Sequence, residues 1–167
     1  MFEITNPPSL CRAMAWRGEA KMSLQILQKE TYLAFIENSV GTRMFSSLIA
    51  QDSETGKITD ILENGRYSCA VFVSNLLYLF QMTEKTSATV LSLLRNLEND
   101  PRWRLIAPDS SLPGDVIFWE KRRGNDHVGF VVTPEEAVSN NAKSRMIIRH
   151  YIDDRGPILH AFRFMGW

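Results

Sequence analysis

A cysteine at the start of an apolar segment is the first residue that could perform covalent chemistry. Cys69 follows the polar stretch 51–66 and opens the run from Ala70 to Phe80, which is apolar nearly all round. Such a run predicts a helix buried in the centre of a domain, with Ser68 as its N-cap. A thiol in the first turn lies at the positive end of the helix dipole, which lowers the thiol pKa and favours the nucleophilic thiolate. Cys69 is therefore a candidate nucleophile, although free cysteines also commonly fill space in cores.

A cysteine nucleophile needs a base within hydrogen-bond reach, and His127 is the first candidate for that base. It opens the predicted strand 127–132, directly after the polar turn 124–126. A histidine at the end of a strand can reach a partner without being enclosed. Gly129, two residues further on, points to the same face and leaves room beside the imidazole.

The chain has only two other histidines. His150 lies in the predicted strand 145–152 and could approach the site, but packing on the sheet is the simpler interpretation. His160 is expected to be structural. A zinc site built from Cys69, His127 and His150 would lack the closely spaced ligand pair typical of such sites, so we expect no bound metal.

Helices are expected in the first half of the chain, where they would carry the nucleophile. A helix with Ser23 as its N-cap is predicted to end near Gly41, and another is predicted over 87–98. The first has an apolar stripe of Leu24, Leu27, Thr31, Ala34 and Phe35, and the second turns Val90, Leu93, Leu94 and Leu97 inward. The polar stretch 51–66 is expected to be an exposed connection.

Short segments rich in Val, Ile and Phe dominate the second half, and turn residues separate them. They cover 115–120, 127–132, 136–140, 145–152 and 158–164. Strands joined by short loops predict an antiparallel sheet. Helices followed by strands predict an α+β fold with the helices packed on one face of the sheet. We expect a single domain over 1–167, in which 1–22 has no assigned structure.

Composition narrows the classes of function. The 167 residues carry 19 Lys and Arg against 19 Asp and Glu, so the electrostatic attraction that non-specific nucleic-acid binding needs is missing. The run 70–80 is far shorter than the ~20 apolar residues of a membrane span. Two cysteines, Cys11 and Cys69, make no disulfide framework. The start of the chain shows no secretory signal, so a cytoplasmic location is the default expectation and export without a leader is the alternative.

Three segments together resemble the NlpC/CHAP superfamily of papain-like cysteine peptidases and amidases. They are Ser68-Cys69-Ala70 at a helix start, Pro113-Gly114-Asp115-Val116 at a strand start, and Asp126-His127-Val128-Gly129. Upstream, the segment 41–45 resembles the short Gly-Thr segment that precedes the cysteine in many members. The likeness covers roughly residues 25 to 152.

The resemblance implies a papain-like fold, with a nucleophile helix packed on a small antiparallel sheet, and no metal or organic cofactor. Cys69 matches the nucleophile and His127 the base. A polar residue on the next strand should orient the imidazole, and Asn140 is the choice, because an amide oxygen can accept from the imidazole N–H. Ser139 is the alternative if the register differs by one residue, and His150 is a further one.

The implied activity is hydrolysis of amide bonds, most often in cell-wall peptides. His127 would take the Cys69 proton, and the thiolate would attack the carbonyl to form a thioester acyl-enzyme. The backbone N–H of Cys69 would stabilise the oxyanion. The alternatives are an intracellular thiol-dependent deamidase or acyltransferase of the same fold, and a binding module that has lost catalysis.

Overall fold

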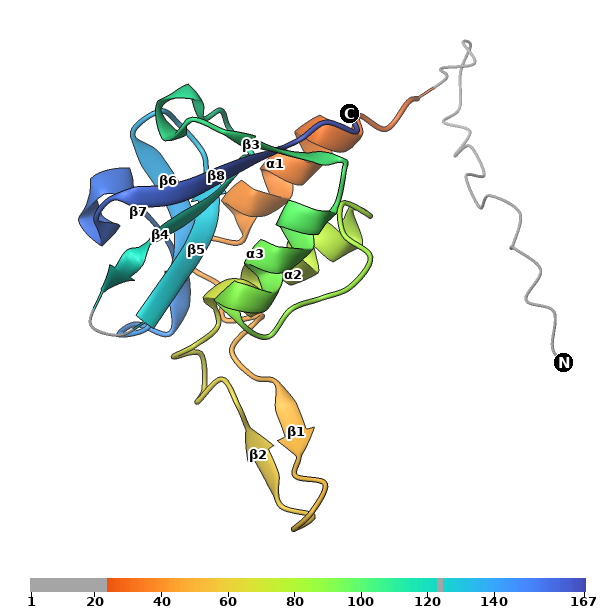
Figure 1. Cartoon of the computed structure of the whole chain (residues 1–167), viewed down its shortest axis with the longest axis vertical. Coiled ribbons are helices and arrows are strands. Elements are labelled where there is room, and N and C mark those ends of the chain that lie inside the picture. Colours follow the sequence, from red (N-terminus) through yellow and green to blue (C-terminus); the bar gives the residue numbers. More distant parts are fainter. Residues whose placement is uncertain (1–23, 123–124) are drawn as a thin grey trace, which may run out of the picture.

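Three α-helices and eight strands make up the described part of the chain. The computed structural model describes residues 24–122 and 125–167, so 1–23 lie outside the description (Figure 1). Ser23 and Cys11 are among them. In chain order, the elements are α1 (Gln28–Asn38), β1 (Ile49–Gln51), β2 (Ile58–Asp60), α2 (Cys69–Leu79), α3 (Val90–Asn99), β3 (Trp103–Ile106), β4 (Val116–Arg122), β5 (Asn125–Val131), β6 (Glu136–Asn141), β7 (Met146–Tyr151) and β8 (Ile158–Phe164), with short 3₁₀ turns at Pro108–Ser110 and Ile152–Arg155.

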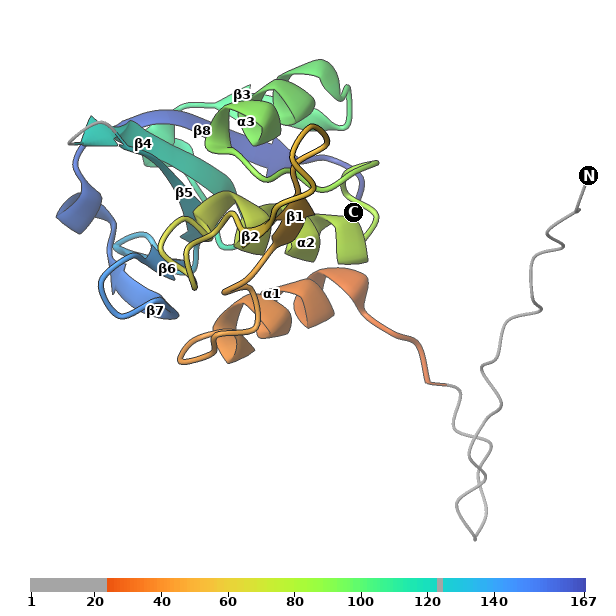
Figure 2. The ribbon, with the colours of Figure 1, turned by 90° about the horizontal axis from the view of Figure 1, so that it is seen from below.

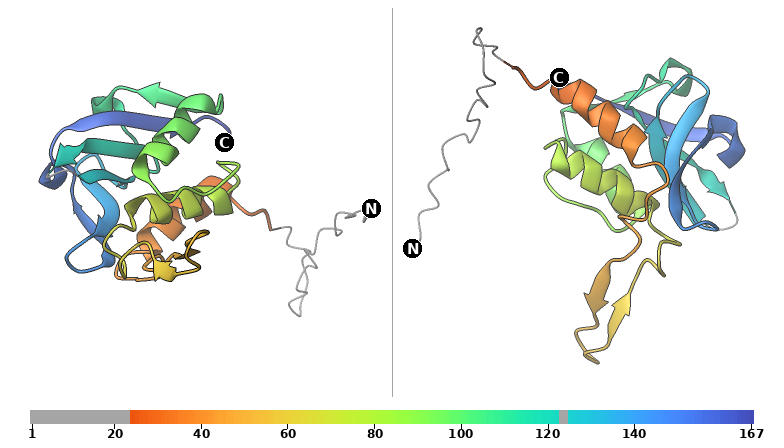
Figure 3. Two further views of the ribbon diagram at one scale, coloured as in Figure 1. Left: turned by 60° about the horizontal axis from the view of Figure 1, so that its bottom comes forward. Right: turned by 180° about the vertical axis from the view of Figure 1, so that it is seen from behind.

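The main sheet has six strands in the order β3-β8-β4-β5-β6-β7, and every neighbouring pair is antiparallel. The helices lie together on one side of it, as Figure 2 and both views of Figure 3 show. Helix α2 packs on the centre of the sheet, over β5 and β6. The expected α+β class, with N-terminal helices on a C-terminal antiparallel sheet, is confirmed.

Helix α2 forms where its sequence predicts, and eight of its eleven residues are buried, while Tyr78 and Leu79 near its end are exposed. Phe72 is fully buried and meets Phe130 of β5 edge to face, with ring centroids 5.4 Å apart. Ser74 is also buried, and its hydroxyl pairs with the backbone of Ser87, which holds the segment before α3 against α2. Contacts with β5 and with the segment before α3 therefore hold the central helix in place, and with it the first turn that carries Cys69.

Helix α1 differs from the prediction in its start and in its buried face. It begins at Gln28, and Leu24 and Leu27 are exposed, as is Phe35. Tyr32 and Ile36 form the buried face instead, and the Tyr32 hydroxyl donates to the Gly114 carbonyl over 2.9 Å. Burial of the Tyr32 ring and its hydrogen bond to Gly114 therefore orient the helix, in place of the stripe from Leu24 to Phe35 that we expected to face the core.

Two features of the chain were not expected as strands. Residues 49–60 form a β1–β2 hairpin that projects away from the body (Figures 1 and 3), within a stretch predicted to be a connection. Asp52 organises its turn by accepting from the backbone of Glu54 and Thr55. The four-residue strand β3 pairs with β8 at the edge of the sheet. Both are short, so a periodic pattern does not develop.

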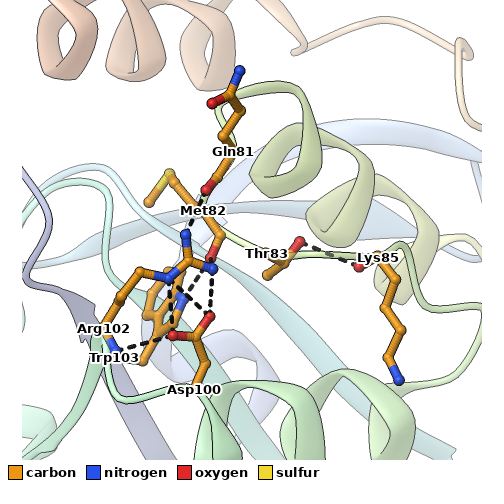
Figure 4. Close-up of polar contacts among 7 residues, drawn as sticks. All are labelled: Gln81, Met82, Thr83, Lys85, Asp100, Arg102 and Trp103. Atoms are coloured by element: carbon orange, nitrogen blue, oxygen red, sulfur yellow. Dashed lines mark hydrogen bonds and ion pairs between the residues drawn. The ribbon is translucent and has the colours of Figure 1, made fainter. Parts of the chain in front are cut away.

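Helix α3 forms where a helix was predicted over 87–98, but it begins at Val90, after Thr89 as the N-cap accepting from Ser92. Leu93 and Leu97 are buried as expected. The loop after α2 is tied to β3 by a polar cluster that Figure 4 shows. Arg102 pairs with Asp100 over 2.6 Å and donates to the Gln81 carbonyl, while the Trp103 indole N–H donates to Met82. These bonds hold the residues that follow the C-terminal end of α2, which is the end far from Cys69, against Arg102 and Trp103.

The Pro-Gly-Asp segment before β4 has a structural role. Gly114 has φ +92°, and a Cβ there would lie 3.0 Å from the ring of Tyr32. The buried Asp115 carboxylate pairs with Arg163 of β8 over 2.7 Å and accepts from the Leu112 N–H. This turn therefore joins α1, β4 and β8.

Within the described residues, none of the helices has the length and apolar character needed to cross a membrane.

Candidate active site

Cys69 is a free thiol on the first residue of α2. Ser68 is the N-cap residue, but it has helical backbone angles and its side chain makes no capping bond, which corrects the expected cap. Within the described part of the chain, the buried Ser68 hydroxyl has no hydrogen-bond partner. The backbone N–H groups of Cys69 and Ala70 lower the pKa of the thiol.

Burial raises the pKa of the Cys69 thiol, and this is opposed by backbone N–H groups of Val128, Ala70 and Cys69 and by the charge of Arg155. The sequence predicted the opposite shift. Cys69 is only 8% exposed. The free-energy cost of removing a thiolate from water is larger than the stabilisation that the helix N-terminus and one nearby guanidinium provide. The resting sulfur is a thiol.

His127 lies in β5 and lines the same cavity as Cys69, a hollow of about 710 Å³. The backbone N–H of Val128, the residue after His127, lowers the pKa of the Cys69 thiol. Cys69 and His127 therefore line one cavity, although 58 positions separate them in the sequence.

Ser139 is the strand residue that binds His127. Its hydroxyl lies 2.9 Å from His127 Nε2, and the side chain is fully buried. Asn140 was the expected partner, but successive residues of a strand point to opposite faces, and Asn140 lies on the helix-facing side. Its amide donates to the Gly65 carbonyl over 2.8 Å. Asn140 lines the cavity and holds the loop before α2, while Ser139 makes the bond expected of Asn140.

His150 also belongs to this group, which was the less favoured of its two interpretations. Its Nε2 lies 2.7 Å from the Ser139 hydroxyl, and its Nδ1 lies 2.8 Å from the Tyr151 carbonyl oxygen. The indole of the buried Trp119 packs against both imidazoles, with ring centroids 5.4 Å from His127 and 5.7 Å from His150. The indole N–H is itself held by the Ile152 carbonyl. His160 lies on β8, beside Phe162.

Burial, together with the smaller effects of the charges of Arg155 and His150, lowers the pKa of His127 to about 3. Burial also lowers the pKa of His150 below its usual value. Both imidazoles are therefore neutral near pH 7, and so is the thiol. The resting site therefore contains no thiolate–imidazolium ion pair.

Arg155 is the residue of this site that the sequence analysis missed. It follows β7 in a 3₁₀ turn, lines the cavity with Cys69 and His127, and donates to the Asn140 carbonyl over 3.2 Å. Its charge lowers the pKa values of Cys69, His127 and His150. The only available signal was an arginine after Asp153-Asp154, which is an ordinary surface pattern.

The rest of the cavity wall contains both polar and apolar residues. Charged side chains of both signs line it, together with the phenol of Tyr67 and the first residues of α3; the charged residues are Arg66, Arg155, Glu120, Asp126 and Asp154. In the described ranges, no group of three or more His, Cys, Asp or Glu side chains is placed to hold a metal ion.

A scan against models of protein families and a search of curated proteins find no match for this chain.

Proposed function

We propose that the protein is a cysteine hydrolase of the papain-like NlpC/CHAP kind that cleaves amide bonds in peptidoglycan-type peptides. The observation that carries the proposal is the shared cavity of Cys69 and His127, with His127 held from behind by Ser139. A thiol at a helix N-terminus, a base and a polar residue that orients the base are the parts that thiol-dependent acyl transfer requires.

In the proposed reaction, His127 takes the thiol proton while the sulfur attacks the substrate carbonyl. The backbone N–H groups at the start of α2 stabilise the oxyanion that develops, because they have no partner within the helix. His127 then gives its proton to the leaving amine, which leaves a thioester on Cys69. Water attacks the thioester with His127 again as base, and the acid product leaves.

The cavity lining supports a peptide substrate with charged ends. Cell-wall peptides carry free amino and carboxyl groups, and the wall offers acidic and basic side chains within one hollow. Charge-assisted hydrogen bonds to such groups would orient the scissile bond above the sulfur.

The direct test is mass spectrometry of purified murein peptides incubated with the native chain and with Cys69→Ala. We expect cleavage, with one water added across an amide bond, only by the native chain. A brief acid quench should also capture an acyl adduct on the Cys69 peptide that hydroxylamine removes. Ser68→Ala is a matched control, because it removes a buried neighbouring hydroxyl that makes no hydrogen bond among the described residues. It should cleave like the native chain.

Cleavage by both the native chain and Cys69→Ala, or by neither, would overturn the proposal. Transfer of the acyl group to an added amine in place of water would support the intracellular acyltransferase alternative.

A further inference from the structure

Two histidines and a serine form a continuous chain of hydrogen bonds behind the candidate base. It runs from His127 through Ser139 to His150 and ends at the backbone carbonyl of Tyr151. Three strands supply it, since His127 lies on β5, Ser139 on β6 and His150 on β7. The chain is short and partly buried, so each proton in it has few possible positions.

The Tyr151 carbonyl sets the direction of the first bond. A carbonyl oxygen can only accept, so His150 Nδ1, at 2.8 Å, must carry the proton of that bond. His150 is neutral near pH 7, since burial lowers its pKa. A neutral imidazole has one N–H, so its Nε2 is left as an acceptor.

The remaining bonds follow in order. The Ser139 hydroxyl donates to His150 Nε2 over 2.7 Å, because that nitrogen has no proton to give. The hydroxyl has a single proton, so towards His127 it can only accept, and His127 Nε2 must donate over 2.9 Å. His127 is neutral as well, and its other nitrogen, Nδ1, is left without a proton.

We propose that His150 is a positioning residue that fixes the tautomer of His127 through Ser139, so that Nδ1 is the nitrogen that receives the thiol proton. The inference rests on the proposed function for its catalytic meaning, but the tautomer can be measured without a substrate. Trp119 supports the arrangement, because its indole packs on both rings and opposes rotations that would exchange their nitrogens.

The consequence for catalysis is that His150 acts without touching the substrate or the sulfur. If Ser139 turned its proton towards His127, Nε2 would accept, and Nδ1 would carry the proton of the neutral ring. His127 could then no longer take a proton at Nδ1. An acceptor at the position of His150 Nε2 is what prevents this reversal.

The test is a two-bond ¹H–¹⁵N correlation spectrum of the full chain with ¹⁵N-labelled histidine at neutral pH. The chain has three histidines, and single substitutions assign them. We expect a protonated Nε2 with a bare Nδ1 at His127, and the opposite pattern at His150. A protonated Nδ1 at His127, or a protonated Nε2 at His150, overturns the inference, whether or not murein peptides are cleaved.

Variants separate positioning from simple packing. His150→Leu removes the acceptor, so we expect signal from the Nδ1-protonated form at His127 and a kcat about 100-fold lower with little change in KM. His150→Gln places an amide oxygen near the position of Nε2 and should retain the native His127 tautomer and most of kcat. His160→Gln is the matched control on another strand, and it should leave both readouts unchanged.

Thermal unfolding of each variant checks that it is folded. A folded His150→Leu chain with the native His127 tautomer would overturn the role of His150. The loss of the tautomer in both His150 variants would overturn the role of an acceptor at that position.

Discussion

Gly129 lies directly opposite Ser139 in the β5–β6 ladder, and a Cβ at Gly129 would stand only 2.8 Å from the Ser139 Cβ. The same Cβ would lie 2.7 Å from the Val138 carbonyl oxygen and 3.2 Å from the indole of Trp119. Neither the backbone of Val138 nor the fully buried Ser139 can shift to make room without a substantial cost in free energy. The absence of a side chain at Gly129 is thus what lets Ser139 and Trp119 close around His127.

Gly129→Ala should separate β5 from β6 locally. We expect the free energy of unfolding to fall by about 1–3 kcal/mol, the range for overpacked interiors. We also expect the His127 Nε2–Ser139 contact to weaken. Urea unfolding measures the first effect and the histidine ¹⁵N spectrum the second. A native midpoint together with a native spectrum would contradict this account of Gly129.

Ser139 and Asn140 are neighbours with separate roles, so their alanine variants should differ in kind. Ser139→Ala removes the acceptor of His127 Nε2, and we expect kcat to fall by about 10- to 100-fold. Asn140→Ala removes the bond to the Gly65 carbonyl, and we expect a loss of about 1–2 kcal/mol of stability with kcat nearly retained well below the melting temperature.

Peptide-cleavage kinetics and urea unfolding on both variants make the comparison. The reverse pattern, in which Asn140→Ala loses kcat and Ser139→Ala does not, would restore Asn140 as the residue that orients His127.

The sequence was sufficient to predict the helix and the strands that carry the residues of the candidate site. The apolar run after Cys69 predicted α2, and the Val- and Ile-rich segments predicted β4 to β8, because their lengths allow a periodic pattern to appear. A motif placed Cys69 and His127 in one candidate site, and both residues line the same cavity. The exact strand register did not follow, since a choice between Ser139 and Asn140 depends on a single residue of alternation.

Other features depend on contacts between distant residues, which no local pattern records. The buried face of α1 is decided by Tyr32 reaching Gly114, which lies 82 positions away. The role of His150 depends on three strands meeting side by side. The direction of the Cys69 pKa shift depends on its burial, and position at a helix start alone predicted the wrong sign.

The thiol should react slowly with alkylating agents at neutral pH. Because burial raises the pKa of Cys69, we expect its rate of iodoacetamide labelling to be low near pH 7 and to rise only in the alkaline range. Mass spectrometry of the Cys69 peptide follows this residue separately from Cys11. Rapid labelling with an apparent pKa below about 7 would contradict the buried neutral thiol.

Arg155 provides a sharper version of the same test. Its charge favours the thiolate, so Arg155→Met should move the labelling profile of Cys69 to still higher pH. Arg66→Met is the matched control, because Arg66 lines the same cavity but pairs with Glu63. Equal shifts in both variants would show a general effect of charge in place of a local one.

Stability should fall on mild acidification because His127 is buried in its neutral form. Its pKa is about 3 in the folded chain and about 6.5 when unfolded, so between these values the unfolded chain binds a proton that the folded chain does not. The free energy of unfolding is then fully retained above pH 6.5 and decreases as the pH falls towards 3, by up to about 1.4 kcal/mol per pH unit. The lowered pKa of His150 changes the free energy of unfolding in the same direction as the pH falls.

Urea unfolding between about pH 5 and 7 isolates this effect, because the aspartates whose pKa values are lowered lose their contribution only below about pH 4, the unfolded range of Asp. His127→Gln should flatten the curve over this window, and His150→Gln should flatten it in part. The native chain and His127→Gln should therefore converge in relative stability as the pH falls. Parallel curves for the two chains would mean that His127 is not held neutral in the fold, and the assignment of His127 as an uncharged base beside a neutral thiol would fail with it.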